Sequence, residues 1–371
     1  MRIQRHLCQK CGKSYSEEYA FLVRRSWYGR DVRRYAVDQW VHGRTSLRRT
    51  AEFVRSLMGH QDRWWYWHPW EEPKPGRDRC KLSHTTLQRW LDMAGVKAQE
   101  SIPGQLEGLE TSGQMGTDGL WVRLRGKGKR VILSLVDSAT GLICGVIVTK
   151  GEEAAESWQL LFERARAMGL AWEQLNGVTS DGAHGLLSFM RSSLSGVHHQ
   201  RCIWHFWRGL AKDLKRAAAQ ASRGLDKETA QNARQELTSI LHGIIDAPSF
   251  EQAEKALAQL NMHPQGKALA KKVNEQLDRL LYHLLASHQG LIRVGPEWLW
   301  RDFRLRLSHG RNHGSTERNE RAALVWSIYH NFTPAQRRSE RKRIYKHPGQ
   351  SPLQVAGGAP DAICYLDALG V

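Results

Sequence analysis

The sequence predicts an α/β protein in which a mixed sheet, interrupted by a helical insertion, follows an all-α domain. Strand-like and helix-like patterns alternate between residues 113 and 206, as expected of a sheet covered by helices. The apolar spacing of residues 207–300 is helical almost throughout, and residues 31–97 show the same period. A chain of 371 residues with 41% hydrophobic content can form two or three domains with sizeable cores.

The excess of basic residues is confined to two regions. The chain has 55 Lys and Arg against 37 Asp and Glu, a formal net charge of +18. Residues 1–97 account for +10 and residues 301–349 for +8, while the rest is balanced. Two separated basic regions, both richer in Arg than in Lys, are typical of nucleic-acid-binding surfaces. Solvated surface charge without a partner is the alternative interpretation.

The sequence shows no segment suited to a membrane. It contains no apolar run of the roughly 18 residues that a span requires, and no apolar signal follows Met1. We therefore expect an intracellular protein without a membrane partner. In that compartment the six cysteines are expected to be thiols or metal ligands rather than disulfides.

The N-terminal segment carries half of a zinc-binding pattern. Cys8 and Cys11 form a Cys-x-x-Cys pair followed by Gly12 and Lys13, which resembles one knuckle of a zinc ribbon. A complete site needs four ligands, and the sequence holds no second Cys-x-x-Cys. Both interpretations stay open: Zn²⁺ held by this zinc-knuckle-like segment, or a turn without metal.

Residues 31–97 have the pattern of a helix-turn-helix domain. Asp31 starts one helix, the turn Gly43–Ser46 leads to a second, and Ser83 is positioned to cap a third. Polar residues at the start of the third helix suit contacts to base edges, as in a recognition helix. An ordinary three-helix bundle is the alternative. The predicted DNA contacts of this region are Arg44, Arg48, Arg49, His84, Thr85, Gln88 and Arg89.

From residue 113 the pattern is that of a sheet. Residues 115–124, 131–137 and 142–148 predict an antiparallel meander joined by Gly-containing turns. A helix over about 153–168, a strand at 177–181, a further helix and a strand at 197–202 follow. Three strands, a helix and further strands alternating with helices predict a ribonuclease-H-like layer.

Two aspartates stand in strands of this layer beside glycines. Asp118 is followed by Gly119, and Asp181 by Gly182. Such positions contribute little to sheet stability but present carboxylate oxygens well to Mg²⁺. A carboxylate on the helix after the insertion would complete a set of three that holds two metal ions.

These motifs together resemble a known family. Thr117-Asp118-Gly119, Ser180-Asp181-Gly182, Cys202-x-x-His205 and a helical insertion followed by Thr316-Glu317 occur in this order. In this combination, over about residues 115–330, the chain resembles the Mutator-type DDE transposases of bacterial insertion sequences. The resemblance implies a ribonuclease-H-like core that cuts and joins DNA using two Mg²⁺ or Mn²⁺ ions.

The resemblance also implies roles for individual residues. Asp118, Asp181 and Glu317 are expected to bind the metals and carry catalysis, and His205 to contact the reacting strand or orient a carboxylate. Glu320 is the alternative third acid; Glu317 is preferred because Thr316 precedes it and Arg321 follows four positions later. Arg318 and Arg321 are further predicted DNA contacts.

The chain is thus expected to bind double-stranded DNA, both terminal inverted repeats and target, as a homodimer or larger assembly in the bacterial cytoplasm, associated with the nucleoid. The rival functions are a non-catalytic DNA-binding regulator and a nuclease that cuts without joining.

The sequence predicts five divisions of the chain. They are a zinc-knuckle-like segment 1–30, a helix-turn-helix domain 31–97, a catalytic core 113–206 with 301–333, an insertion 207–300 and a basic tail 334–371.

Overall fold

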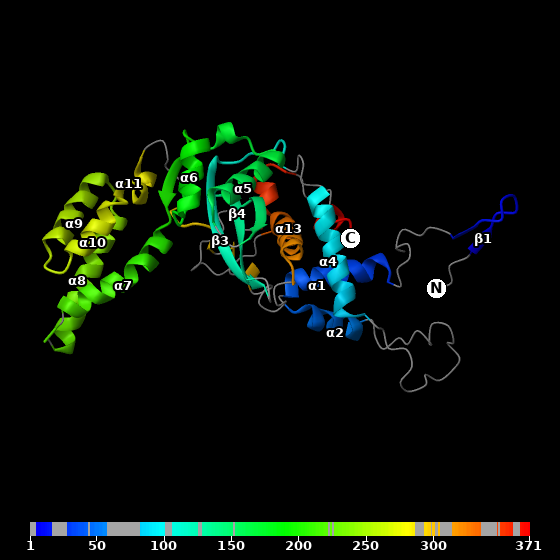
Figure 1. Cartoon of the computed structure of the whole chain (residues 1–371), viewed down its shortest axis with the longest axis horizontal. Coiled ribbons are helices and arrows are strands. Elements are labelled where there is room, and N and C mark those ends of the chain that lie inside the picture. The colour runs from blue at the N-terminus through cyan, green and yellow to red at the C-terminus, as the bar shows by residue number, and fades with distance from the viewer. Residues whose placement is uncertain are drawn as a thin grey trace.

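The structure is a computed structural model of the whole chain (Figure 1). It describes residues 5–16, 28–43, 45–57, 82–100, 106–124, 128–150, 153–221, 223–224, 226–285, 293–297, 299–300, 303–304, 314–334, 347, 349–358 and 364–371. Within this part of the chain, none of the helices is both long and apolar enough to cross a bilayer.

A five-stranded mixed sheet forms the centre of the molecule. Its strands are β3 (Gln114–Leu124), β4 (Gly128–Asp137), β5 (Ile143–Thr149), β6 (Gly177–Ser180) and β7 (His198–Arg201), in the order β5-β4-β3-β6-β7. The meander β3-β4-β5 is antiparallel, and β6 and β7 add parallel to β3. The predicted α/β class with a mixed sheet is confirmed, as are the five strands to within a few residues.

Two helices that alternate with the strands pack against the sheet. They are α5 (Ala155–Ala167) and α6 (His184–Ser193), with the short η1 (Trp172–Gln174) leading into β6. Gly145 of β5 admits α5 closely, because a Cβ there would lie 3.2 Å from Cδ1 of Leu161. Phe162 and Phe189, on the two helices, pack with ring centroids 5.2 Å apart, which fixes α5 beside α6.

Helix α13 (Thr316–Phe332) closes the free edge of the sheet. Asn331 accepts a hydrogen bond from the backbone N–H of Ile143 at 2.9 Å and donates one to its carbonyl at 3.0 Å, so the side chain replaces a missing strand at the edge. Trp326 stacks on Phe303, with ring centroids 4.8 Å apart, and Trp300 packs beside both. The helix after the insertion thus returns to the same core as the meander.

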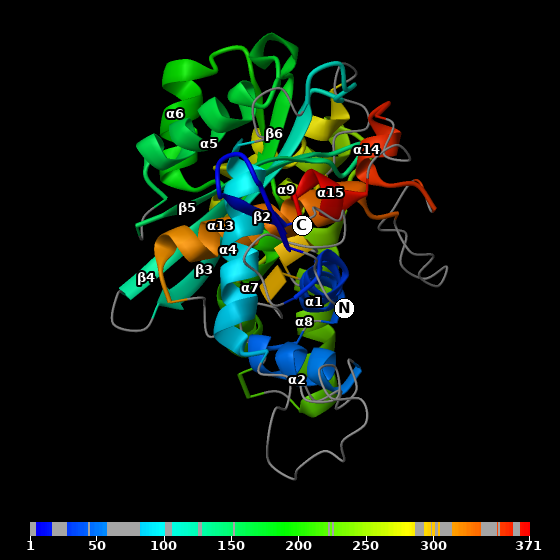
Figure 2. The ribbon, with the colours of Figure 1, turned by 90° about the vertical axis from the view of Figure 1, so that its right-hand side faces the viewer.

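The N-terminal helices share this core. They are α1 (Arg30–Gly43), α2 (Leu47–Leu57) and α4 (His84–Glu100), and Ser83 caps α4 by accepting from the N–H of Thr86 at 3.2 Å. Figures 1 and 2 show α4 alongside α13, and a side chain at Gly95 would collide with Arg321, so the glycine permits this close approach. One continuous set of buried side chains runs from Trp40 and Trp90 to the strands. The structure therefore places α1, α2 and α4 on the sheet assembly itself.

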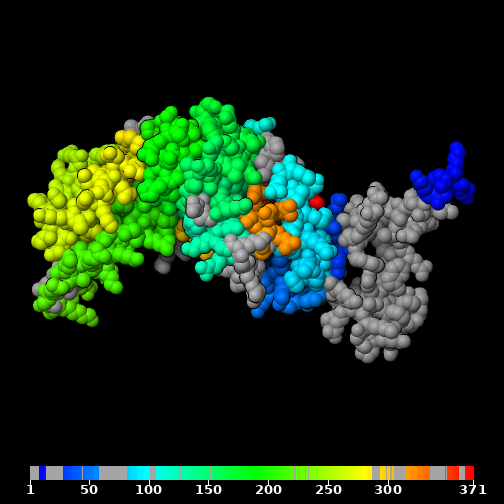
Figure 3. Space-filling view, viewed as in Figure 1, coloured from blue at the N-terminus to red at the C-terminus, as the bar shows by residue number. Residues whose placement is uncertain are grey.

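The insertion forms a second hydrophobic core. Its elements are α7 (Ile203–Ala221), α8 (Lys227–Ile245), α9 (Phe250–Met262), α10 (Lys267–Asn274), α11 (Leu277–Leu280) and η2 (Tyr282–Leu284). Leu237, Leu241, Leu260 and Val273 are buried within it. Figure 3 shows this helical body at one end of the molecule, with α4 and α13 adjoining on the surface toward the other end.

The chain ends pack differently. Near the C-terminus, α14 (Pro352–Val355) and α15 (Tyr365–Ala368) return to the N-terminal helices, where Arg34 pairs with Asp367 at 2.6 Å. At the N-terminus, β1 (Arg5–Leu7) and β2 (Ser14–Ser16) form a separate antiparallel hairpin. This hairpin carries the predicted zinc knuckle at its turn.

Candidate active site at the centre of the sheet

Asp118 lies in the middle of the central strand β3. Its carboxylate is almost fully buried, with a residue exposure of 6%. The preceding Thr117 donates its hydroxyl hydrogen to the carbonyl of Ser134 at 2.6 Å, which fixes β3 against β4 at this level. A buried carboxylate needs a proton, a cation or hydrogen-bond donors to be stable. Asp118 is thus a group whose surroundings must supply one of them.

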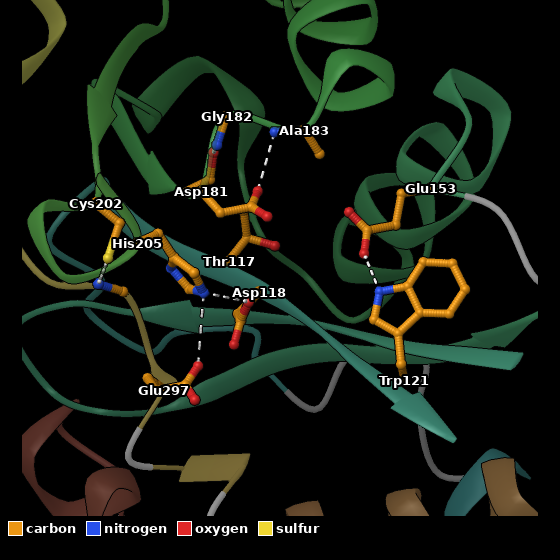
Figure 4. Close-up of polar contacts among 12 residues, drawn as sticks. Thr117, Asp118, Trp121, Glu153, Asp181, Gly182, Ala183, Cys202, His205 and Glu297 are labelled. Carbon is orange, nitrogen blue, oxygen red and sulfur yellow. Dashed lines mark hydrogen bonds and ion pairs between the residues drawn. The ribbon is translucent and has the colours of Figure 1, made fainter. Parts of the chain in front are cut away.

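Asp181 directly follows β6, the strand parallel to β3. The chain turns at Gly182, whose φ of 75° lies in the left-handed region that favours glycine. The turn brings the N–H of Ala183 to Asp181 Oδ1 at 3.0 Å, and Ser180 Oγ accepts from the N–H of Gly182. Because β6 lies beside β3, the turn sets Asp181 next to Asp118 (Figure 4).

His205 and Glu297 complete a cluster around Asp118. His205 Nε2 lies 3.9 Å from Asp118 Oδ1 and 3.8 Å from Glu297 Oε2. One ligand atom from each of the three residues lies within 4.8 Å of the others, a spacing at which they could hold a metal ion. Figure 4 shows the three side chains converging, with Asp181 above them. The residues fit a divalent cation, since carboxylate oxygens and a neutral imidazole are suitable donors.

The electrostatics of the cluster favour a cation. Burial, followed by the adjacent carboxyl of Glu297, raises the pKa of Asp118 from 3.8 to about 9. Burial lowers the pKa of His205, so its ring is neutral at physiological pH. His205 Nδ1 is buried and accepts or donates no hydrogen bond within the described residues. The Asp118 carboxyl therefore keeps a proton at physiological pH, and a divalent cation held by the two carboxyls and the neutral imidazole would replace that proton.

His205 is held in place by the neighbouring Cys202. The Cys202 sulfur is buried and accepts a hydrogen bond from the N–H of Gly295 at 3.2 Å. The N–H of Ile203 donates to the carbonyl of Arg293 at 3.0 Å. These two contacts join the start of the insertion to its end, and they bring His205 and Glu297 to the same place from opposite ends of the insertion.

Glu153 adds another acid on the other side of β3. Its Oε1 accepts a hydrogen bond from Trp121 Nε1 at 3.0 Å. The close approach depends on Gly119, where a Cβ would lie 2.6 Å from Glu153 Oε1. Burial, and then the charge of Asp181, raises the pKa of Glu153. Glu153 therefore lies within electrostatic reach of Asp181 and apart from the cluster formed by His205 and Glu297 (Figure 4).

Glu317 and Glu320 lie on α13 rather than in this cluster. Glu317 is exposed in the first turn of α13, where Ser315 caps the helix by accepting from the N–H of Arg318 at 3.1 Å. Thr316 accepts a bond from Arg130 Nε at 3.2 Å, near the end of β4 that is remote from Asp137. Glu320 forms an ion pair with Arg164 of α5. The acids that the structure adds to the aspartates are thus Glu297 and Glu153.

The predicted DNA contacts divide into exposed and packed groups. Exposed side chains are those of Arg48, Arg49, His84, Thr85, Arg89 and Arg318. Gln88 is half-buried and donates to Asp92 at 3.1 Å, and Arg318 pairs with the same Asp92 at 3.3 Å. Arg321 packs where α13 meets α4 at Gly95. Arg44 lies outside the described residues.

The Cys-x-x-Cys pair sits on the turn of the N-terminal hairpin. The N–H of Gly12 donates to the carbonyl of Cys8 at 2.8 Å, and Gly12 has a φ of 67°. A backbone N–H, and then the Cys11 thiol, lower the pKa of Cys8. This geometry presents both sulfurs from one tight turn, as a zinc knuckle does.

Sequence reasoning did not find Glu297 or Glu153 as site residues. Glu297 appears in the sequence only within the Pro296-Glu297-Trp298 segment that ends the insertion, and Glu153 only near the start of a predicted helix. A signal was present for Glu153, because Gly119 beside Asp118 indicates that something approaches the strand closely. Nothing local marks Glu297.

Known proteins match the part of the chain that carries this site. Residues 114–289 match the family described as "Transposase, Mutator family". The chain is 29% identical over 205 residues to the transposase for insertion sequence element IS256 in transposon Tn4001 of Staphylococcus aureus, and equally to the one so named from Enterococcus faecalis (strain ATCC 700802 / V583). Each match covers 48% of this chain and 50% of the relative, so the chain spans about half the length of the curated relatives it matches. Residues 114–289, which carry the two aspartates and His205, are thus similar to the Mutator family of transposases.

Proposed function

We propose that the protein is the transposase of an insertion sequence, which binds terminal inverted repeats and cuts and joins DNA with divalent metal ions in the bacterial cytoplasm. The carrying observation is the convergence of Asp118, His205 and Glu297 within 4.8 Å, beside Asp181 on the neighbouring parallel strand. The strand order β5-β4-β3-β6-β7, with carboxylates on the central β3 and its parallel neighbour, supports a ribonuclease-H-like core.

In this proposal the chain's own residues prepare the reaction. Asp118 and Asp181 would hold two Mg²⁺ or Mn²⁺ ions, and Glu317 would supply the third carboxylate that the family pattern implies. The chemistry that such ions would supply is activation of a water or 3′-hydroxyl as nucleophile and stabilisation of the leaving oxygen. Glu297 and His205 bear on Asp118 directly, and the neutral imidazole of His205 is able to accept a proton or orient the Asp118 carboxylate.

The N-terminal helices supply the proposed binding of DNA ends. The exposed His84, Thr85 and Arg89 at the start of α4 would read base edges, and Arg48 and Arg49 on α2 would contact phosphates. The further proposed DNA contacts are Arg44, Gln88, Arg318 and Arg321. We propose Cys8 and Cys11 as Zn²⁺ ligands. The proposed active form is a dimer or larger assembly. The net charge of +10 over residues 1–97 supports this assignment.

The decisive experiment combines labelled terminal repeats, a target plasmid and Mg²⁺. We expect cleavage at the element ends and joining to the target, and Asp118→Asn to lower both by about a thousandfold or more. Strands that are cut but never joined would make the protein a nuclease. End binding without any cleavage, unchanged by Asp118→Asn, would make it a regulator.

A matched series identifies the third acid. Glu317→Gln, Glu297→Gln and Glu320→Gln each remove one charge while keeping the side-chain shape. If Glu317 is the third ligand, Glu317→Gln abolishes cleavage, while Glu320→Gln, which loses only the pair with Arg164, changes it little. Loss of Mn²⁺ binding in Glu297→Gln together with full activity of Glu317→Gln would transfer the role to Glu297.

End recognition is better tested by point variants than by truncation. Removing residues 1–97 would also remove Trp40, Leu87 and Trp90 from the core shared with the sheet. Arg89→Ala and His84→Ala change exposed side chains only. We expect them to weaken binding to the repeats more than to unrelated DNA, and equal losses on both DNAs would contradict a recognition role for α4.

A further inference from the structure

An arginine-lined cavity lies beside the candidate active site, between the sheet and the insertion. It has a volume of about 830 Å³ and lies among α6, β7 and the segment that joins α10 to α11. We propose that this cavity binds the sugar-phosphate backbone of the DNA strand next to the bond that is cut. The inference rests on the proposed function and assigns a substrate contact to the insertion.

The cavity borders the metal-binding cluster through Arg201 and Gly182. Both residues line it, and Gly182 directly follows Asp181. A Cβ at Gly182 would lie 2.5 Å from Arg201 Nη1, so the guanidinium lies over the turn that positions Asp181. A strand held between Asp118 and Asp181 would therefore have its neighbouring phosphates at the mouth of the cavity.

The charged lining of the cavity is mostly basic. Its ionisable residues are Arg191, Arg201, Arg279, His184, His199 and a single acid, Glu275. In the part of the chain that the structure describes, no ion pair joins Arg201 or Arg279 to a carboxylate, and Arg201 Nε is buried without a hydrogen-bond partner. The guanidinium groups of Arg201 and Arg279 repel each other. An anion bound between them would offset this repulsion.

The effect of this crowding appears in neighbouring side chains. Burial lowers the pKa of Arg201, and Arg279 lowers it further, while Asp181 opposes the change. Burial, together with Arg279 and Arg201, lowers the pKa of His199 to about 3, so His199 is neutral and contacts Ser180 Oγ at 2.7 Å. His199 thus adds no positive charge to the cavity at physiological pH, whereas the arginines do.

The remaining lining suits a nucleotide chain better than a small inorganic anion. Leu187, Met190, Leu194 and Val197 supply an apolar wall beside the arginines. A cavity of this volume is within the range of about 300–1,000 Å³ typical of organic ligands, so it accommodates a nucleotide unit rather than one phosphate. Arg279 and Gln276 come from the insertion, while Arg191 and Arg201 come from the sheet layer. The insertion therefore forms one wall of a strand-binding channel.

The experiment measures DNA binding without catalysis. Fluorescence anisotropy with a labelled single strand of mixed sequence, in EDTA, is recorded between about 50 mM and about 200 mM salt for the full-length protein. We expect Arg279→Ala and Arg191→Ala each to raise the Kd about three- to tenfold and to reduce the salt slope by about one. Arg279→Lys should restore the slope but only part of the affinity, since lysine keeps the charge and loses the bidentate geometry.

Arg234→Ala is the matched control. Arg234 is an exposed arginine on α8 of the same insertion and does not line the cavity. Its replacement should leave the Kd and the salt slope unchanged. Thermal unfolding of every variant separates a lost contact from a lost fold, and Arg279→Lys keeps the test informative if Arg279→Ala is unstable.

Three results would overturn the inference. The first is that Arg279→Ala and Arg191→Ala bind DNA with the same Kd as the parent. The second is that Arg234→Ala loses as much DNA affinity as the cavity variants. Inorganic phosphate that stabilises the parent against heat, combined with unchanged DNA binding in the cavity variants, would make the cavity a site for free phosphate. Because binding is measured without metal, a parent that binds as expected but never cleaves would refute the proposed function, while the binding of a DNA strand in the cavity would still be established.

Discussion

The two aspartates of the candidate site have contrasting surroundings. Asp118 is buried against Glu297 and a neutral His205, and the donor to its carboxyl is the backbone N–H of Gly119. Asp181 accepts the N–H of Ala183 and lies near the guanidinium of Arg201, with Glu153, itself bonded to Trp121, in electrostatic reach. Asp118 is thus crowded by a second carboxyl, whereas Asp181 has a donor from its own turn and a positive charge nearby.

If both aspartates bind metal as proposed, they would do so in different ways. Asp181 is oriented by the backbone of a tight turn, so its geometry would be set before an ion binds. Asp118 and Glu297 instead repel each other and keep a proton until a cation replaces it. Metal binding at Asp118 should therefore depend strongly on pH.

The largest expected effect is the pH dependence of metal binding at Asp118. Its pKa is 3.8 ordinarily and about 9 in the fold, so between these values the native state keeps a proton that the unfolded state has lost. Metal must displace this proton, and we expect Mg²⁺ affinity to rise by up to about tenfold per pH unit between about pH 7 and about pH 8.5. Calorimetric titration at several pH values measures it.

The same proton makes the metal-free protein less stable as pH rises. Over that window the free energy of unfolding should fall by at most about 1.4 kcal/mol per pH unit, because the unfolded state binds fewer protons. His205 contributes little, since burial lowers its pKa in the fold and its ordinary value of 6.5 leaves it mostly neutral above pH 7 in the unfolded state. Asp118→Asn should flatten both profiles, and an equally steep profile in that variant would refute the assignment.

A smaller effect is expected on the Asp181 side. Glu153→Gln removes a charge near Asp181 but keeps the bond from Trp121, so we expect cleavage to fall about tenfold, with Mg²⁺ affinity changing less than in Glu297→Gln. Gly119→Ala is the companion variant, since its Cβ would push the Glu153 carboxylate away. Glu153→Gln losing as much activity as Asp118→Asn would place Glu153 among the metal ligands and remove the contrast between the two sides.

The smallest effect concerns the cap of α13. Ser315→Ala removes the bond to the N–H of Arg318 and should cost about 1 kcal/mol of stability. Ser249 caps α9 in the same way, by accepting from the N–H of Gln252, and Ser249→Ala is the matched control. If Glu317 serves the site, only Ser315→Ala should also slow cleavage. Equal activity of the two variants would leave Glu297 as the favoured third acid.

Much of the fold could be predicted because its signals are local. Apolar runs bounded by Gly turns located the strands, and Ser83 and the Thr45-Ser46 turn located the starts of two helices. The packing of these helices and strands against one another could not be predicted in this way. Residues 98–112 have the composition of a linker, yet Leu106 is buried and its N–H donates to the carbonyl of Met168 at 2.6 Å. The shared core of α4, α13 and the sheet depends on such long-range contacts.

The candidate site divides along the same line. Asp118 and Asp181 could be singled out because each combines a strand position with an adjacent glycine, which is visible in the sequence. Glu297 could not, since its approach to Asp118 depends on how the chain returns from a long insertion. For His205, the Cys-x-x-His spacing predicted that the residue belongs to the site. Which carboxylates it faces could be read only from the structure.

The contacts between Cys202 and Gly295, and between Ile203 and Arg293, form a narrow stem through which the insertion leaves and re-enters the core. Closing a loop costs little more when the loop is lengthened, so α8 and α9, beyond this stem, could vary in length at a small entropic cost. The segments near the sheet could not, because His205 and Glu297 adjoin the stem and Gln200 of β7 bonds the carbonyl of Leu280 and the N–H of His283. A displacement of the insertion would therefore be transmitted first to two neighbours of Asp118.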